Sequence, residues 1–244
     1  MTPLTEGKQR AMGLPEPSPL GVIFDMDGVL VDSYWAHLKS WQIVAAQEGR
    51  QITEQEFAAT FGRTSREIIA SWPNACYTDE QIAQLDRRKE AAFRELLAAH
   101  FTPMPGVHQM LERLAQAGFR LAVGSSGPPE NVAMVLDRLG WKDRFAAVVH
   151  GMDISRGKPE PDVFLLAAQR AGLQPANCVV VEDAPVGIEA AHRAGMKAIG
   201  LISTGRTAEQ LAAADLVVHH LEEITPQQIL ALLRPLPLSE AGRK

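Results

Sequence analysis

The chain has 244 residues, of which 46% are hydrophobic and 22% are charged, and its formal net charge is −5. This is the composition of an ordinary globular protein, with enough length for one large domain or two modest ones. The acidic balance and the lack of a long basic run argue against nucleic acid or a membrane surface as a partner, and no apolar run approaches the length of a membrane span.

The amino-terminal segment, residues 1–18, is expected to be a flexible leader. It carries several prolines and no hydrophobic stretch of the kind that a secretory signal needs. The two cysteines, Cys76 and Cys178, lie far apart, and neither has a histidine or a second cysteine beside it. We therefore expect two small buried apolar residues and a reducing, cytoplasmic location.

The first strong signal is an apolar run that ends abruptly in two acids. Val22 to Phe24 are apolar without alternation, which predicts a buried parallel strand, and Asp25 and Asp27 follow at its carboxyl end. Side chains repeat with a period of two along an extended chain, so both carboxylates are expected on one side. Gly28 permits a turn there. Ligands bind beyond the carboxyl ends of strands in open α/β sheets, which favours a functional site over a plain turn cap.

Residues 33–102 are predicted to form an all-helical domain inserted into the α/β core. The segment is rich in Ala, Gln, Glu, Arg and Leu, its apolar residues have helical spacing, and no stretch reads as a convincing strand. Asp32 or Ser33 is expected to cap the first helix. A proline-containing break at residues 102–106 ends the insert. Because the insert leaves the sheet directly after the acid pair, we expect it to stand beside or above those acids.

Beyond the insert, strands and helices alternate, which predicts a doubly wound parallel-sheet α/β core. This core is expected to comprise residues 19–32 and 103–236, followed by a tail at 237–244. Further strands are predicted at 119–124, 145–150, 178–182, 197–201 and 215–218. Helices are predicted at 110–117, 129–139, 161–171 and 185–194, in an alanine-rich stretch between the last two strands, and at 225–233.

Small hydroxyl residues follow the second strand of the core. Ser125 and Ser126 stand between this strand and a helix, where a hydroxyl and backbone N–H groups can hold an anion. A plain serine-rich turn explains the same residues equally well. Further along, Lys158 lies before two prolines that flank Glu160 and restrict the backbone. We therefore expect the position of its ammonium group to be restricted. A solvated lysine is the competing and more usual explanation.

Another predicted strand ends in a second acid pair, Glu182 and Asp183, directly before a proline that suits the start of a helix. Asp183 alone would serve as a helix cap. A cap needs only one acid, however, and hard cations prefer oxygen ligands. The pair therefore makes a Mg²⁺ site plausible at the carboxyl edge of the sheet.

These four stretches resemble, in order and at the usual spacing, the four motifs of the haloacid dehalogenase superfamily of phosphotransferases. They are the DMDGVLVDS segment that starts at Asp25, the segment around Ser125, the one around Lys158, and the one around Asp183. The resemblance covers residues 20–224. The helical insert resembles the small cap of the subgroup that includes β-phosphoglucomutases, phosphoglycolate phosphatases and sugar-phosphate phosphatases.

The resemblance implies a mechanism for the core residues. Asp25 would attack phosphorus and form an aspartyl-phosphate, while Asp27 would protonate the leaving oxygen and then deprotonate the incoming water or hydroxyl. Lys158, Ser125 and Ser126 would bind the phosphate. Mg²⁺ would be held by Asp25, the main-chain carbonyl of Asp27 and Asp183, with Glu182 bound through water or in the second shell.

The resemblance also points to residues of the cap that would contact the substrate. A loop that would close over the pocket contains Gly62 and Arg63, and Arg66 follows it. Lys89 matches a cap-helix lysine of sugar-phosphate enzymes, and His37 matches a hinge-side histidine of the mutases. Helix capping and solvated side chains are the competing explanations for these residues.

One departure from the family pattern bears on the reaction. Where β-phosphoglucomutases carry polar groups for the substrate's second phosphate, this chain has Gly127 and Pro128. We therefore expect a Mg²⁺-dependent phosphatase acting on a small phosphorylated metabolite, such as a sugar phosphate. The alternatives are a β-phosphoglucomutase-like phosphotransferase and a non-catalytic phosphometabolite-binding module. A monomer is expected, with a homodimer as the alternative.

Overall fold

The protein is described from a computed structural model, which describes residues 18–60, 65–72, 76–203 and 205–234. Its centre is a six-stranded sheet with the order β3-β2-β1-β4-β5-β6, in which every neighbouring pair is parallel. The strands are β1 (Gly21–Phe24), β2 (Arg120–Gly124), β3 (Ala147–Val149), β4 (Cys178–Glu182), β5 (Lys197–Leu201) and β6 (Leu216–Val218). The order changes direction at β1, which is the switch point where such sheets bind ligands.

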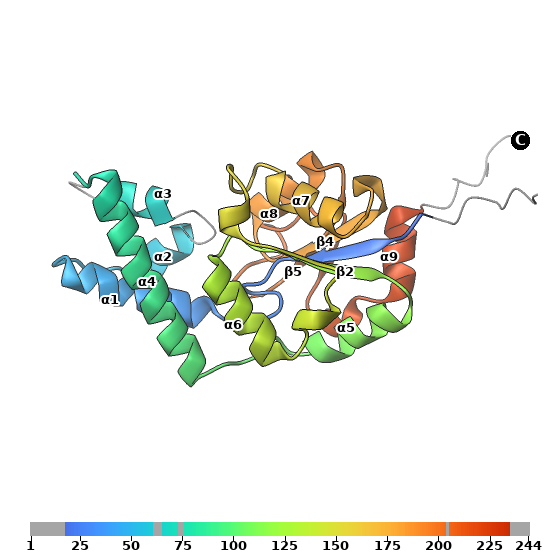
Figure 1. The fold of residues 1–244 in the computed structure, drawn as a ribbon, viewed down its shortest axis with the longest axis horizontal. Helices are drawn as coiled ribbons and strands as arrows, with labels where there is room; N and C mark the ends of the chain where they lie inside the picture. The colour runs from blue at the N-terminus through green and yellow to red at the C-terminus, as the bar shows by residue number, and fades with distance from the viewer. Residues whose placement is uncertain (1–17, 61–64, 73–75, 204, 235–244) are drawn as a thin grey trace, which may run out of the picture.

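Helices cover both faces of the sheet (Figure 1). Val22 and Phe24 of β1 point into a core shared with α5 (Val107–Gln116), α6 (Pro129–Leu139) and α9 (Pro226–Leu233). Ile23 points the other way, into a core shared with α7 (Asp162–Arg170) and α8 (Pro185–Arg193). Both faces of β1 are thus buried, which explains why its sequence is continuously apolar. Short 3₁₀ turns occupy Lys142–Arg144, Gly151–Asp153, Pro175–Asn177 and Leu221–Glu223.

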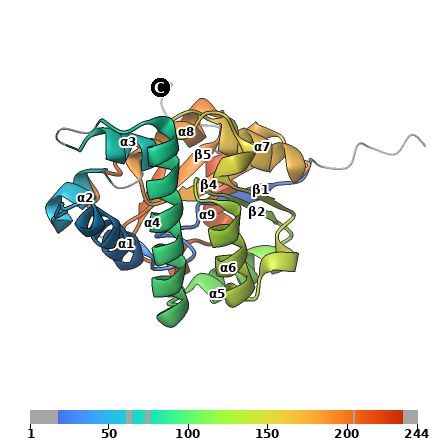
Figure 2. The ribbon, with the colours of Figure 1, turned by 60° about the vertical axis from the view of Figure 1, so that its left-hand side comes forward.

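Of the described helices between β1 and β2 in the chain, the first four stand to one side of the sheet (Figures 1 and 2). They are α1 (Tyr34–Gln47), α2 (Glu54–Thr60), α3 (Ser65–Ala70) and α4 (Asp79–Ala99). This group, called the cap below, has a hydrophobic cluster of its own that includes Trp41, Phe57 and Leu85, while Phe93 and Leu97 of α4 pack into the core cluster. Thr78 and Gln81 form a capping box that starts α4.

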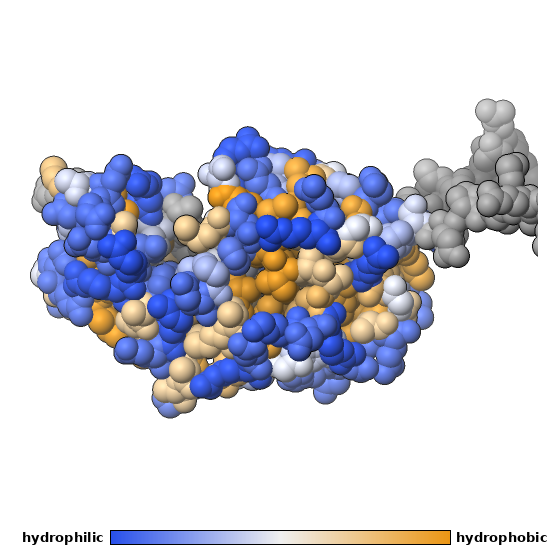
Figure 3. Space-filling model, in the orientation of Figure 1, coloured by the Kyte–Doolittle hydropathy of each residue, from blue (hydrophilic) through white to orange (hydrophobic). Residues whose placement is uncertain are grey.

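Two linkers join the cap to the sheet, and they are hydrogen-bonded to each other. The Asp32 amide donates to the Thr102 carbonyl at 2.9 Å, and the Met104 amide donates to the Leu30 carbonyl at 3.1 Å. The cap therefore leaves and re-enters the core at one place. In Figure 3 the exterior of the cap is mainly hydrophilic, and a notch separates it from the core.

The structure confirms the predicted fold class, a doubly wound parallel sheet with an inserted helical group. The strands at 178–182 and 197–201 and the helix at 129–139 have the predicted bounds. The other core strands and helices differ only at their ends, except for the alanine-rich segment between β5 and β6. The cap boundaries at 33 and 102 remain a prediction. The predicted leader at 1–18 and tail at 237–244 consist almost wholly of residues outside the described ranges.

Three local predictions are wrong. The alanine-rich segment before β6 forms successive turns rather than a helix, because its amides bond three residues back, as from Leu211 to Ala208. Ser33 occupies the N-cap position of α1, yet neither it nor Asp32 caps the helix with its side chain, since the Ser33 hydroxyl donates to Asp27 instead. Cys178 is buried as expected, but Cys76 is exposed. Within the described ranges, no helix combines the length and apolarity that a bilayer crossing requires.

Candidate active site

The topology brings the predicted site residues to one edge of the sheet. β1 lies between β2 and β4, with Phe24 in register with Val123 on one side and Val181 on the other. Asp25, Ser125 and Glu182 therefore stand at the carboxyl ends of three adjacent parallel strands. The Asp25 amide still continues the ladder by donating to the Val181 carbonyl at 3.0 Å. The position of these side chains is thus fixed by sheet register rather than by a mobile loop.

Two glycines allow the acids to approach so closely. Gly28 has a φ of +78°, and a Cβ at this position would overlap the Asp183 carboxylate. A Cβ at Gly187, in the first turn of α8, would overlap the Glu182 carboxylate in the same way. Only a residue without a side chain fits at either place. Gly28, in the first motif, therefore leaves the space that the Asp183 carboxylate, in the fourth motif, occupies.

Lys158 joins two of the acids from the loop before α7. Its Nζ lies 2.6 Å from Asp25 Oδ1 and 2.6 Å from Glu182 Oε1. The other oxygen of Glu182 accepts hydrogen bonds from the backbone amides of Asp183 and Ala184, each at 2.9 Å. Both Glu182 oxygens are thereby used, so this residue orients the lysine and the start of α8. The ammonium also lies 4.8 Å from the centroid of the Phe164 ring.

Asp25, Glu182 and Asp183 form a buried acidic cluster whose candidate ligand atoms lie within 4.8 Å of one another. Three carboxylates against the single ammonium of Lys158 leave a formal charge of −2. Burial, together with the charges of Glu182 and Asp27, raises the pKa of Asp25 to about 7 against the opposing effect of Lys158. Burial and the neighbouring acids also raise the pKa of Asp183. Three buried carboxylates that together carry excess negative charge suit a divalent cation, so the donor set fits a metal such as Mg²⁺.

Asp27 has a different environment from Asp25 although it lines the same cavity. Its Oδ1 accepts a hydrogen bond from the Ser33 hydroxyl at 2.5 Å and lies 3.2 Å from His37 Nε2 on α1. Burial opposes ionisation of Asp27, but His37 and Ser33 outweigh it and lower the pKa of this carboxyl. Two acids that are two residues apart are therefore pushed toward opposite protonation states.

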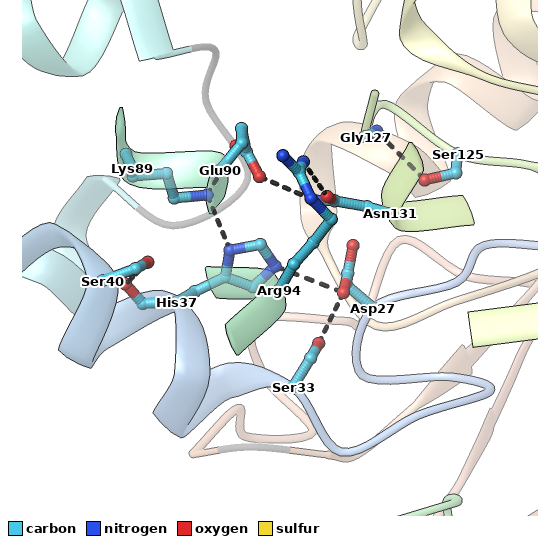
Figure 4. A network of polar contacts seen from close by, with 10 residues as sticks. All are labelled: Asp27, Ser33, His37, Ser40, Lys89, Glu90, Arg94, Ser125, Gly127 and Asn131. Carbon is cyan, nitrogen blue, oxygen red and sulfur yellow. Dashed lines mark hydrogen bonds and ion pairs between the residues drawn. The ribbon is translucent and has the colours of Figure 1, made fainter. Parts of the chain in front are cut away.

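A chain of polar contacts runs from Asp27 through the cap and back to the core (Figure 4). Lys89 Nζ on α4 lies 2.9 Å from His37 Nδ1 and 2.7 Å from Glu90 Oε1. An ammonium has only donors, so Nδ1 accepts and the ring proton lies on Nε2, facing Asp27. Glu90 Oε2 accepts from Asn131 Nδ2 on α6 at 2.6 Å, and Arg94 donates to Asn131 Oδ1 at 2.9 Å.

Most of the remaining predicted residues line one cavity of about 450 Å³ between the cap and the core. Asp25, Asp27, Ser126, Lys158, Glu182 and Asp183 line it from the core, and His37, Arg66 and Lys89 line it from the cap. Ser125 does not line it: its side chain is buried, and its hydroxyl accepts from the Gly127 amide at 3.0 Å. Arg66 is exposed and pairs with Asp79 at 2.8 Å. Gly62 and Arg63 lie outside the described residues.

The sequence analysis missed several residues of this site. Ser33, Glu90, Asn131 and Ser203 hold the named residues in place; Ser203, for example, donates to Asp183 Oδ2 at 3.1 Å. Glu90 had a weak signal, since it directly follows Lys89. Asn131 had none, because its partners are 37 and 41 residues away in sequence.

Comparison with known proteins agrees with this geometry. A family model for haloacid dehalogenase-like hydrolases matches residues 22–201. The fructose-1-phosphate phosphatase YqaB of Escherichia coli is 36% identical over 179 residues, which span 73% of this chain and 94% of that protein. The β-phosphoglucomutase of Bacillus subtilis is 32% identical over 84% of this chain and 91% of its own length.

Similarity extends to solved structures. A family IA hydrolase of the same superfamily from Entamoeba histolytica superposes with a TM-score of 0.81 at 26% identity, over 88% of this chain and 99% of that one. The chain therefore belongs to the haloacid dehalogenase-like hydrolase family, and it is an enzyme.

Proposed function

We propose that this protein is a Mg²⁺-dependent phosphatase that hydrolyses a small phosphorylated sugar through an aspartyl-phosphate. The observation that carries the proposal is the convergence of Asp25, Lys158 and the acidic cluster in the cavity between the cap and the core. A volume of about 450 Å³ is in the range of small-molecule sites. Similarity to a fructose-1-phosphate phosphatase supports a phosphorylated sugar as the substrate class.

Asp25 is the proposed nucleophile. A carboxylate oxygen of Asp25 forms a bond to phosphorus while the bond from phosphorus to the sugar oxygen breaks. Lys158 contacts Asp25 directly, so its ammonium stands where the transferring phosphoryl group gathers negative charge. The Ser125 hydroxyl, which already accepts from the Gly127 amide, retains its own proton to donate, and Ser126 offers its backbone from the cavity wall.

Asp27 is the proposed acid and base. In the first step it gives its proton to the departing sugar oxygen, and in the second it takes a proton from the water that attacks the phosphorus bound to Asp25. His37 and Ser33 favour the ionised form of Asp27, which is the form that the second step needs. An incoming phosphate dianion would raise the pKa of Asp27 by charge repulsion, which favours the protonated form for the first step.

Mg²⁺ would be held by the carboxylates of Asp25 and Asp183 and the main-chain carbonyl of Asp27. Glu182, which is bonded to Lys158, would contact the ion only through water or not directly. When bound, the ion would neutralise phosphoryl oxygens and favour the charged form of Asp25. Ser203 fixes the Asp183 carboxylate toward the cluster.

The cap is the proposed source of substrate selectivity. We propose residues 33–102 as the cap domain on a core of 19–32 and 103–236, with His37, Arg66 and Lys89 contacting or positioning the substrate, and with Gly62 and Arg63 in the loop that closes over it. Lys89 already bonds His37 and Glu90, which suits a positioning role. A cytoplasmic monomer, with a homodimer as the alternative, completes the proposal.

Phosphate release tests this function. The chain is assayed against fructose 1-phosphate, glucose 1-phosphate, phosphoglycolate, nucleotides and pyrophosphate, with and without Mg²⁺. Asp25→Asn is expected to lower turnover by at least about 10³-fold, and acid quenching of the native enzyme should trap a phosphorylated peptide containing Asp25. Full turnover by Asp25→Asn would refute covalent catalysis by Asp25, whereas release of phosphate from no probe by the native protein would favour the non-catalytic binding module.

A β-phosphoglucomutase-like phosphotransferase is the second candidate, favoured by the 32% identity to the Bacillus subtilis mutase. Gly127 and Pro128 line the cavity and have no polar side chain that could bind a second phosphate. This favours hydrolysis over the mutase reaction. Conversion of glucose 1-phosphate to glucose 6-phosphate faster than free phosphate appears would decide for the mutase.

A further inference from the structure

One face of α4 forms the wall of the cavity opposite the acidic cluster. The α4 residues that line the cavity recur once per helical turn: Asp79, then Ile82 and Ala83, then Asp86, then Lys89 and Glu90. Residues with this spacing share one face of a helix. Glu80 is not among them and bonds instead to Gln84 and Arg87 at the surface.

The described cations on this wall are already paired. Lys89 is buried and bonds Glu90, and Arg66 bonds Asp79. Each positive charge on the described cap side of the cavity therefore has a carboxylate beside it. A second anionic group on a substrate would have to compete with these carboxylates for the cations.

Asp86 is the third carboxylate on this wall, and it differs from the other two. Within the ranges that the structure describes, no lysine or arginine lies within salt-bridge distance of it. Its partner is Ser65, whose hydrogen bond lowers the pKa of Asp86 against a larger raising effect of burial. The side chain is only partly buried, so its carboxylate oxygens remain reachable from the cavity.

Partly burying a carboxylate costs free energy unless hydrogen-bond donors compensate for the lost water. Ser65 supplies one donor, and a carboxylate has room for several. Trp41 and Ile82, which line the same cavity, carry neither a hydroxyl nor a charge, and the ammonium of Lys89 is already bonded to His37 and Glu90. The hydroxyl groups of a polyhydroxylated substrate could supply the further hydrogen-bond donors that the Asp86 carboxylate can accept.

Building on the phosphatase function proposed above, we propose that Asp86 is a specificity-determining residue that accepts hydrogen bonds from hydroxyl groups of the leaving group and repels leaving groups with a second anion. The substrate class is then a monophosphate ester of a sugar or polyol. Bisphosphates and phosphorylated carboxylic acids are disfavoured because their second charge meets a carboxylate that forms no salt bridge with a described lysine or arginine, although Lys89 and Arg87 act on it from a greater distance.

The test compares native enzyme and Asp86→Asn by kcat/KM with Mg²⁺. The probes are fructose 1-phosphate and sorbitol 6-phosphate as polyhydroxylated monophosphates, fructose 1,6-bisphosphate as the doubly charged counterpart, and phenyl phosphate as an ester without hydroxyls. In Asp86→Asn, kcat/KM for the preferred monophosphate relative to phenyl phosphate should fall on the order of 10-fold or more, since the hydrogen bonds lost are to a charged group. Discrimination against the bisphosphate should weaken.

Glu80→Gln is the matched control, because it removes one carboxylate from the same helix outside the cavity lining. Asp86→Ser provides a second variant, and thermal unfolding of each protein verifies folding. The inference is wrong if native enzyme cleaves phenyl phosphate but prefers neither monophosphate to it, or if the substrate ratios of Asp86→Asn equal those of Glu80→Gln. If native enzyme releases phosphate from no probe, the phosphatase proposal itself fails, and this inference falls with it.

Discussion

At the scale of single residues, the site separates two aspartates that the sequence presents as a pair. Asp25 faces Lys158 and the acidic cluster, where burial raises its pKa to about 7. Asp27 faces Ser33 and His37, which hold its pKa below its usual range. Such a division suits a nucleophile that is activated by a bound cation and an acid–base group that is controlled from the cap.

The raised pKa of Asp25 predicts how metal-free stability depends on pH. In the unfolded chain an aspartate titrates near pH ~3.9, whereas Asp25 in the folded protein titrates at about 7. Between these values the folded state retains a proton that the unfolded state has lost, so the contribution of Asp25 to stability falls as the pH rises. Asp25→Asn removes this penalty.

In EDTA, Asp25→Asn should therefore stabilise the protein more at pH 8 than at pH 5, by a difference of more than about 1 kcal/mol. Urea unfolding of both proteins at the two pH values measures this difference. An equal effect at both pH values would show that Asp25 titrates normally in the folded protein.

Gly28 provides a second prediction at this scale. Gly28→Ala combines an unfavourable backbone conformation with overlap of the new Cβ and the Asp183 carboxylate. Left-handed backbone in a non-glycine residue costs about 1–2 kcal/mol, and displacement of Asp183 should also weaken Mg²⁺ binding at least about tenfold. Thermal unfolding and Mg²⁺ titration of phosphatase activity measure the two effects.

Gly118→Ala is the control for Gly28→Ala. Its φ of +84° carries the same backbone cost, but no atom lies within 4 Å of the added Cβ. It should lose stability without losing Mg²⁺ affinity. Similar Mg²⁺ affinities for the two variants would mean that Asp183 is not a ligand of the ion.

At the scale of elements, α4 connects the cap to the core through α6. Glu90 on α4 shares hydrogen bonds with Lys89 of its own helix and with Asn131 at the start of α6, and Arg94 also reaches Asn131 (Figure 4). The same Lys89 contacts His37, which contacts Asp27. The position of the cap and the environment of the proposed acid–base group are therefore linked by one set of contacts.

Asn131→Ala should break this connection. It removes the amide donor to Oε2 of the buried Glu90, whose Oε1 keeps Lys89, and it removes the acceptor of Arg94, a loss on the order of 1–3 kcal/mol. We expect a lower melting temperature, a higher KM, and faster hydrogen exchange in α4. Glu130→Gln, an exposed change at the preceding position, serves as the control. Unchanged exchange in α4 would argue that the contact does not hold the cap.

At the scale of the whole molecule, the outer part of the cap has its own hydrophobic cluster, while Phe93 and Leu97 of α4 pack into the cluster of the core. Two linkers that are hydrogen-bonded to each other join the cap to the core. The catalytic cavity lies between these two bodies, with walls from both. We predict that the cap moves as a unit about residues 32 and 102, so that substrate would enter when the cap is open and water would be excluded when it is closed.

Small-angle scattering tests this motion. Mg²⁺ together with a phosphate analogue such as orthovanadate should favour the closed form and reduce the radius of gyration of the native protein. Asn131→Ala without ligand should have a larger radius than the native protein. Superimposable profiles in all of these states would contradict closure of the cap.

The sequence by itself determined the class of fold and the main groups of the site. Asp25, Ser125 and Asp183 follow apolar runs that can only be buried parallel strands, and the carboxyl ends of adjacent parallel strands meet at one edge. The helical spacing of the insert likewise depends only on local periodicity. The alanine-rich segment failed because intrinsic helix propensity is a weak preference that tertiary packing overrides.

Only the tertiary structure decided which side chains contact and orient the residues of the site. That Glu182 holds Lys158, that Ser33 turns to Asp27, and that Asn131 meets Glu90 are contacts between distant segments. Hydrophobic periodicity indicates which face of a helix or strand is buried. It does not indicate which polar side chain of another element will contact that face. Asp86 became a candidate for substrate recognition only once α4 was seen to form a wall of the cavity.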